Sequence, residues 1–295
     1  MKRGFIKMSK FSEAEKVQIL EDLVSIKSVN DHEVEVCEYL KDLLSKHGID
    51  SKIIKINDTR ANLIAEIGKD GPVLGISGHM DVVSEGDKNK WTYDPFKLTE
   101  VDNKFYGRGS ADMKSGLAAL VISLIDIKEQ ELLDHGKIRL LATAGEEIVG
   151  EGAKAFQEQG YMKDVEALVI AEPSQDRIVY AHKGSMDIRV TSKGKASHSS
   201  MPHLGFNAIS PLVKFVYKAD EGFEKFNKSN TLLGNVIMNA TIFNGGNQVN
   251  SIPEHAESEF NIRTIPEHDN EQFISYFNEI LKQVETDQTD IEIDT

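Results

Sequence analysis

The chain has little cysteine: Cys37 is the single one among 295 residues. One cysteine can form neither a disulfide framework nor a cysteine-rich zinc site, so we expect a reducing compartment, the cytoplasm. Basic residues are also few, with 34 Lys and Arg against 48 Asp and Glu and a formal net charge of −14. This charge argues against nucleic acid or an anionic membrane as the main partner.

Long hydrophobic runs are missing as well. The longest, residues 117–125, is far shorter than the roughly 20 residues that span a bilayer. The basic residues 1–8 lack the apolar stretch of a signal peptide. What is present, 40% hydrophobic and 28% charged residues, is typical of a globular protein with room for one large domain or two ordinary ones.

Hydrophobic periodicity predicts an α/β domain over residues 1–182, because continuous apolar segments alternate with amphipathic helices. Ser12 and Asp31 are the expected N-caps of the first two helices, and Gly48 ends the second. The predicted helices are 12–28, 31–47, 114–130 and 151–159. The predicted strands are 52–56, 62–67, 73–79, 137–144, 166–171 and 177–182. Residues 84–111 form a loop too long to be idle in a compact domain.

The order of the predicted helices and strands changes after residue 183. The predicted order becomes strand 185–192, helix 205–219, strand 235–243, strand 256–263, helix 269–284 and strand 290–294. This β-α-β-β-α-β series is typical of a ferredoxin-like α+β domain, which we assign to residues 183–295. Gly245 and Gly246 mark the turn between its middle strands.

A histidine follows the apolar strand 73–79. Positions i and i+2 of an extended chain point to the same side, so Asp81 could reach one ring nitrogen of His79 while the other faces a metal. On its own the pattern is more typical of a turn histidine with a solubilising aspartate.

Three further acidic signals fall where this fold places loops at the carboxyl ends of strands. Asp112 lies in GRGSADMK at the start of a helix, the pair Glu146 and Glu147 follows strand 137–144, and Glu172 follows strand 166–171. Each alone is more typical of a helix cap or a solvated turn. Together with His79 they predict an oxygen-rich site for divalent zinc, cobalt or manganese, with enough carboxylates for two ions.

These motifs together resemble one family. GHMDV (78–82), GRGSADMKSG (107–116), AGEE (144–147) and AEP (171–173) are similar, in that order, to the di-zinc aminoacylase and exopeptidase family. The closest branch is that of succinyl-diaminopimelate desuccinylase and acetylornithine deacetylase. The resemblance implies a zinc-exopeptidase-like catalytic domain with a mixed, mostly parallel sheet, followed by a lid and dimerisation domain that makes a homodimer.

The resemblance also implies the metal ligands. His79 would bind the first metal and Glu172 the same ion, Asp112 would bridge both, and Glu147 would bind the second. The expected ions are two zinc, with cobalt or manganese as alternatives.

Catalytic and substrate-binding roles follow from the same motifs. Asp81 would orient His79, and Glu146 would be the general base that activates the bridging water and then protonates the leaving amine. His198 of a second subunit would hydrogen-bond the oxyanion. Asn250 and Arg263 resemble positions that grip the substrate backbone or carboxylate.

The end of the chain departs from the family pattern. Family members return to the catalytic domain after the lid and supply a last histidine ligand, further strands and a glycine-rich loop. This chain ends at Thr295 and has no histidine after His268. We therefore expect an incomplete catalytic domain and an incomplete second metal site.

Three functions stay open at this point. The leading one is hydrolysis of a small N-acyl amino acid, such as N-succinyl-diaminopimelate or N-acetylornithine. The second is dipeptidase or aminopeptidase activity on short peptides. The third is a non-catalytic, metal-binding dimeric fragment, against which the intact set of acidic residues argues.

Overall fold

The computed structural model describes residues 9–175, 177–285 and 290–294. The chain divides into two compact units, Met1–Arg177 and Ile178–Thr295. The prediction that residues 1–8 form no signal peptide lies outside the described residues. Within the described ranges, no helix is both long and apolar enough to cross a bilayer.

The first unit is built on a mixed five-stranded sheet in the order β1-β2-β6-β3-β7. β6 and β3 are parallel, β3 and β7 are parallel, and β1 and β2 run antiparallel to their neighbours. The strands are β1 (Ser51–Lys55), β2 (Ala61–Gly68), β3 (Val73–His79), β6 (Lys137–Thr143) and β7 (Val165–Ile170). Three adjacent parallel strands therefore end at one edge of the sheet.

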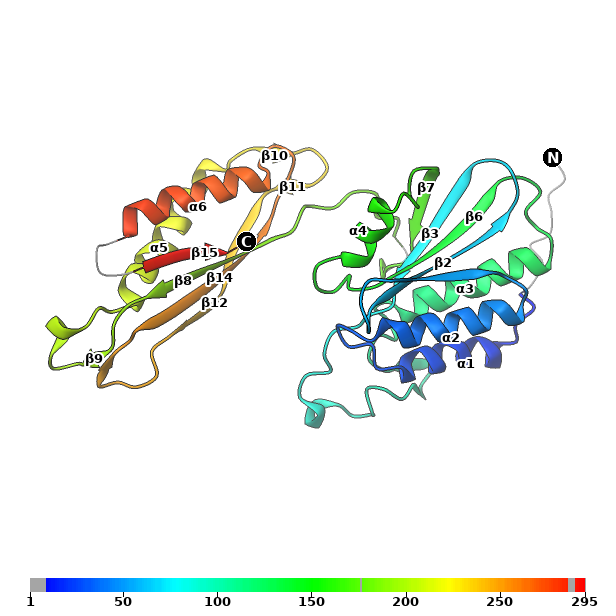
Figure 1. Ribbon diagram of the computed structural model, residues 1–295, viewed down its shortest axis with the longest axis horizontal. Coiled ribbons are helices and arrows are strands. Elements are labelled where there is room, and N and C mark those ends of the chain that lie inside the picture. The colour runs from blue at the N-terminus through cyan, green and yellow to red at the C-terminus, as the bar shows by residue number, and fades with distance from the viewer. Residues whose placement is uncertain (1–8, 176, 286–289, 295) are drawn as a thin grey trace. The chain divides into compact units, whose positions relative to one another are not determined.

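Helices cover both faces of this sheet (Figure 1). α1 (Glu13–Ser25), α2 (Glu33–Lys46) and α3 (Lys114–Glu129) pack on one face around a core that includes Leu23, Leu40 and Val121. α4 (Glu151–Glu158) packs on the other face, where Phe156 contacts a smaller cluster with Ile54 and Leu141. The largest apolar cluster of this unit thus lies between the sheet and the first three helices.

Local signals set the helix ends only in part. Ser12 caps α1 in a capping box with Glu15, and Gly48, at φ +63°, follows the end of α2, as predicted. The prediction of Asp31 as the second N-cap is wrong by one residue. His32 occupies that position at φ 64°, while the Asp31 carboxylate accepts a hydrogen bond from the His32 amide.

The second unit is a four-stranded antiparallel sheet in the order β12-β14-β8-β15. Its main elements follow each other as β8 (Met186–Lys193), α5 (Ile209–Glu221), β12 (Ile237–Gly245), β14 (His255–Arg263), α6 (Asn270–Val284) and β15 (Asp290–Asp294). α5 and α6 lie on the same face of the sheet (Figure 1), where Phe215, Phe260 and Phe277 form part of the core. Burial alternates along β14, as expected for a strand with one covered face.

Two predictions of secondary structure fail. Residues 177–182 form no strand, and Ile178 and Tyr180 are 92% and 78% exposed. The run RIVYAH has high strand propensity, but propensity is not enough without a partner strand. The loop 84–111 contains the short helix Lys88–Lys90 and a hairpin of β4 (Thr99–Val101) and β5 (Lys104–Tyr106), which we did not predict. Short pairs also add β9 (Ser197–His198) with β13 (Ser251–Ile252), and β10 (Ser229–Asn230) with β11 (Gly234–Asn235).

Candidate metal centre

The candidate site lies at the edge where β6, β3 and β7 end. His79 is the last residue of β3 and pairs with Thr143, the last residue of β6. The pairing extends past the strands, because the Met80 amide donates to the Thr143 carbonyl and the Ala171 amide donates to the Ser77 carbonyl. The residues that follow each strand are therefore brought together, as in other open α/β sheets.

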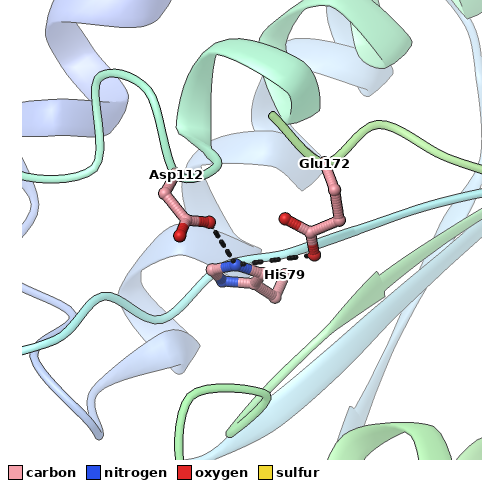
Figure 2. Close-up of side chains that lie close together, drawn as sticks. All are labelled: His79, Asp112 and Glu172. Carbon is pink, nitrogen blue, oxygen red and sulfur yellow. Dashed lines mark hydrogen bonds and ion pairs between the residues drawn. The ribbon is translucent and has the colours of Figure 1, made fainter. Parts of the chain in front are cut away.

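Three side chains converge there (Figure 2). The Nε2 atom of His79 lies 3.2 Å from Oδ1 of Asp112 and 3.8 Å from Oε1 of Glu172. One potential ligand atom from each of these residues lies within 4.8 Å of the others. Oε2 of Glu146 lies 4.0 Å from the same nitrogen. Four of the residues predicted from the sequence therefore surround one point.

Burial and one backbone contact fix the orientation of the His79 imidazole. Its ring is almost fully buried, and Nδ1 lies 2.9 Å from the backbone carbonyl of Asp81. A carbonyl oxygen only accepts, so Nδ1 carries a proton in this contact and Nε2 is left to face the carboxylates. The His79 amide donates to the sulfur of Met113, which immediately follows Asp112.

The carboxylate of Asp81 has hydrogen-bond partners that the sequence did not suggest. Its Oδ1 atom is 3.6 Å from Nδ1 of His79, beyond hydrogen-bond distance. Its two oxygens instead accept hydrogen bonds from the backbone amides of Glu146 (3.1 Å) and Glu147 (3.0 Å). Asp81 thus orients the histidine through its main chain and holds the Glu146–Glu147 turn through its side chain.

Negative charge accumulates at the site. Burial raises the pKa of the Glu172 carboxyl to about 7, and the charges of Asp112 and Glu146 add to the shift. Burial likewise raises the pKa of Glu147, with Asp112 as the next contributor. Burial works to lower the pKa of His79, but the charges of Asp81, Glu172 and Glu146 outweigh it and raise that pKa. A bound cation would relieve this repulsion.

The donor set fits a divalent transition metal. One neutral imidazole nitrogen and several carboxylate oxygens suit zinc, cobalt or manganese. Glu147 lies outside the cluster of His79, Asp112 and Glu172, although the charge of Asp112 helps to raise the pKa of its carboxyl group. The arrangement therefore offers three close ligands and one more acidic group beside them.

Close backbone packing places two of these candidate ligands. Gly116, in the first turn of α3, lies against the main chain of Ala171, and a Cβ atom there would come within 2.1 Å of the Ala171 carbonyl oxygen. Only glycine permits this approach. The ends of α3 and β7, and with them Asp112 and Glu172, can therefore lie next to each other.

Lys114 is a structural residue that the sequence reasoning missed. Its side chain is fully buried, and its ammonium group donates to the carbonyls of Leu23 (2.8 Å) and Ile26 (2.7 Å) at the end of α1. Burial lowers its pKa to about 7. The available signal was a lysine two residues after Asp112 at the start of a largely apolar helix. Lys114 ties the segment that carries Asp112 to the C-terminus of α1.

The remaining predicted residues belong to the second unit. His198, in β9, is exposed, and its Nδ1 lies 2.8 Å from the Ser200 hydroxyl. Asn250 is exposed, and its backbone carbonyl accepts a hydrogen bond from the Ser199 amide at 3.0 Å. Arg263 is the exposed last residue of β14. Their predicted roles stay predictions.

The sequence matches known proteins over most of its length. The model for "Peptidase family M20/M25/M40" matches residues 75–294. A protein of Staphylococcus aureus (strain MRSA252) named probable succinyl-diaminopimelate desuccinylase is 47% identical over an alignment 310 positions long, which covers 97% of this chain and 76% of that protein.

Solved structures show the same fold at low identity. An M20 family metallo-carboxypeptidase from Sulfolobus solfataricus matches 96% of this chain and 78% of its own, with a TM-score of 0.75 and 17% identity. A Bacillus subtilis protein described as a dinuclear metal-binding peptidase of the M20 family matches 95% of this chain and 73% of its own, with a TM-score of 0.60 and 18% identity.

Proposed function

The chain belongs to the peptidase family M20/M25/M40, a family of metal-dependent hydrolases, and from this premise we propose that it hydrolyses the amide bond of an N-acyl amino acid. N-succinyl-diaminopimelate is the proposed substrate, because the 47% identical relative is named a probable desuccinylase of that compound. N-acetylornithine is the alternative. The observation that carries the proposal is the carboxylate of Glu146, whose Oε2 lies 4.0 Å from Nε2 of His79 at the edge of the cluster of His79, Asp112 and Glu172.

We assign the ligands of two divalent ions, zinc with cobalt or manganese as alternatives. His79 and Glu172 would hold the first ion, Glu147 the second, and Asp112 both. Such ions, when bound, polarise a carbonyl group and lower the pKa of a water molecule. The raised pKa values of Glu172 and Glu147 support this assignment, because crowded carboxylates are the expected condition of such a site before a cation binds.

The protein's own groups carry the proton. Glu146 accepts a proton from the attacking water and then donates it to the nitrogen of the leaving amine. Asp81 keeps the main chain of Glu146 in place through the amide hydrogen bond at 3.1 Å. The carbonyl of Asp81 holds the proton of His79 on Nδ1, so Nε2 keeps its lone pair.

The second unit, residues 183–295 in this assignment, would serve as a ferredoxin-like lid and dimerisation domain. β12 is an edge strand, and apolar side chains are exposed on it and on α5 beside it. They are Val213, Tyr217, Ile237, Ile242 and Phe243. We propose that this edge of the sheet joins two copies into a homodimer, because an exposed edge strand with apolar side chains favours pairing with another strand.

Dimerisation would bring the His198 imidazole of one copy to the site of the other, where it would donate to the oxyanion. Arg263 and Asn250 would bind the carboxylate and backbone of the substrate. We place the reaction in the cytoplasm, since the single cysteine, Cys37, is buried and free.

Glu146→Ala tests the proposal. Release of succinate and acetate from the two N-acyl amino acids should fall at least about a hundredfold, with bound zinc retained, because a general base contributes roughly 10²–10⁴ to the rate. Glu158→Ala, an exposed glutamate on α4, serves as the matched control with unchanged turnover. Full turnover by Glu146→Ala would overturn the assignment. Cleavage of dipeptides alone would replace the proposed substrate class by peptides.

A further inference from the structure

Residues 144–152, called loop 144–152 below, join β6 to α4 and include the first two residues of that helix, and they carry both Glu146 and Glu147. Its ends are closed on each other, because the Gly152 amide donates to the Ala144 carbonyl at 3.0 Å. Inside it, the Gly145 carbonyl accepts from Val149 (3.2 Å) and Gly150 (2.8 Å). Asp81 holds the top of the loop through the two glutamate amides, so the position of the loop depends on what holds its base.

Asn62 holds both ends of this loop. It is the second residue of β2 and is fully buried. Its Oδ1 atom accepts from the Ala144 amide at 3.0 Å, and its Nδ2 atom donates to the Gly152 carbonyl at 2.8 Å. A single side chain thus satisfies one donor and one acceptor on the two sides of the loop, where burial makes an unpaired group costly.

Arg60 lies beneath the same loop. It is 8% exposed, and Nη1 donates to Oε2 of Glu151 at 2.9 Å while Nη2 donates to the Asn30 carbonyl. A Cβ atom on Gly145 would lie 3.0 Å from Nη1 of Arg60, so the guanidinium group lies directly against the residue that precedes Glu146. The positive φ of Gly145, 69°, turns the chain over it.

The contacts of Arg60 and Asn62 hold the loop that carries Glu146 and Glu147. They do not involve His79, Asp112 or Glu172. Among the described residues, the Arg60 and Asn62 side chains form hydrogen bonds with loop 144–152 and with Asn30, and Arg60 also forms ion pairs with Asp31 and Glu33. His79, Asp112 and Glu172 are placed instead by β3, the start of α3 and the end of β7. A change at residue 60 or 62 can therefore move one half of the site against the other.

We propose that Arg60 and Asn62 are positioning residues that fix loop 144–152, and so set the distance of Glu146 and Glu147 from the cluster of His79, Asp112 and Glu172. The consequence for turnover rests on the proposed function, whereas the consequence for the loop does not. In the sequence, Arg60 and Asn62 belong to the segment RANL at the start of a predicted strand. We assigned these two residues no role from the sequence.

Arg60→Lys and Asn62→Ala test the proposal against Arg139→Lys. Arg139 is the matched control, because it is also 8% exposed, lies in the same sheet on β6 and binds Asp164 and the Tyr161 carbonyl instead of the loop. Hydrogen exchange of the peptide 144–152 is measured by mass spectrometry on the metal-free chain. We expect exchange to be about tenfold faster in both test variants and unchanged in Arg139→Lys.

Kinetics and zinc content complete the test. We expect kcat to fall about a hundredfold with KM nearly unchanged, since a misplacement of about 1 Å costs that much in rate. Zinc per chain should fall while the remaining ion stays tightly bound.

Unchanged exchange of 144–152 in both variants, or an equal increase in Arg139→Lys, would overturn the proposal. If the unaltered chain hydrolyses no substrate, the proposed function fails, and the exchange result still decides the positioning role. Arg60→Lys is the milder variant and keeps the test decisive if Asn62→Ala does not fold.

Discussion

Asp81→Asn replaces one oxygen of a fully buried carboxylate with an amino group. In the unaltered protein, Oδ1 accepts from the Glu146 amide and Oδ2 from the Glu147 amide, at 3.1 and 3.0 Å. Asparagine has one acceptor oxygen, so its amino group must face one of these two N–H groups. One hydrogen bond is lost and two donors are left opposite each other.

The expected cost can be estimated from these contacts. A hydrogen bond to a charged group contributes about 1.5–3 kcal/mol, and leaving a buried donor unpaired costs about the same range. Part of this is offset, because burial raises the pKa of the neighbouring Glu33 and the charge of Asp81 adds to that shift, so removing the charge relieves repulsion. We expect the free energy of unfolding of the first unit to fall by about 2 kcal/mol.

Urea unfolding followed by fluorescence measures this change. Trp91, the single tryptophan, belongs to the first unit and reports on it. Asp94→Asn is the matched control, because the exposed Asp94 uses one oxygen to accept from the Phe96 amide, and asparagine can do the same. We expect the control to change stability by less than about 0.5 kcal/mol. A urea midpoint for Asp81→Asn equal to that of the unaltered protein would refute the reasoning, as would an increase.

Three further outcomes are expected. Burial raises the pKa of the Cys37 thiol to about 12, so near pH 8 only about one thiol in ten thousand is ionised, and a thiol reagent should label it only after urea unfolds the first unit. Fast labelling of the native protein would contradict this burial. Glu172→Ala should abolish tight zinc binding in equilibrium dialysis, whereas Glu158→Ala should not; equal binding by both would remove Glu172 from the ligand set. Ile242→Lys, on the edge strand β12, should shift the protein to a monomer in light scattering, and an unchanged dimer would exclude pairing at that edge.

The sequence predicts best what is decided locally. α6 was expected at 269–284 and spans Asn270–Val284, because its apolar residues recur at helical spacing and Asp269 caps it. The strand expected at 73–79 is confirmed as β3, a continuous apolar run between a proline and a histidine. In both cases the pattern that defines the element lies within the element itself.

Features that need a distant partner were missed or misassigned. The run 177–182 has strand propensity but pairs with no strand among the described residues. Lys114 was overlooked because its partners are carbonyls of Leu23 and Ile26, about 90 residues earlier in the chain. The carboxylate of Asp81 was matched to His79, two residues away, whereas its hydrogen-bond donors are 65 and 66 residues away.

The candidate site shows why the motifs alone left its geometry open. Two of the acidic motifs follow a strand and the third precedes α3, but their convergence depends on the spatial order β6-β3-β7, which no local pattern encodes. With β3 in the centre, the loops after both neighbours close over His79, and with β3 at an edge one of them would lie a strand spacing of nearly 5 Å farther away. The remaining positions are set by Gly116 against Ala171 and by Asn62 across loop 144–152. The geometry of the site therefore depends partly on residues that have no proposed catalytic or metal-binding role. The hydrogen-exchange comparison of Asn62 and Arg60 with Arg139 tests that dependence directly.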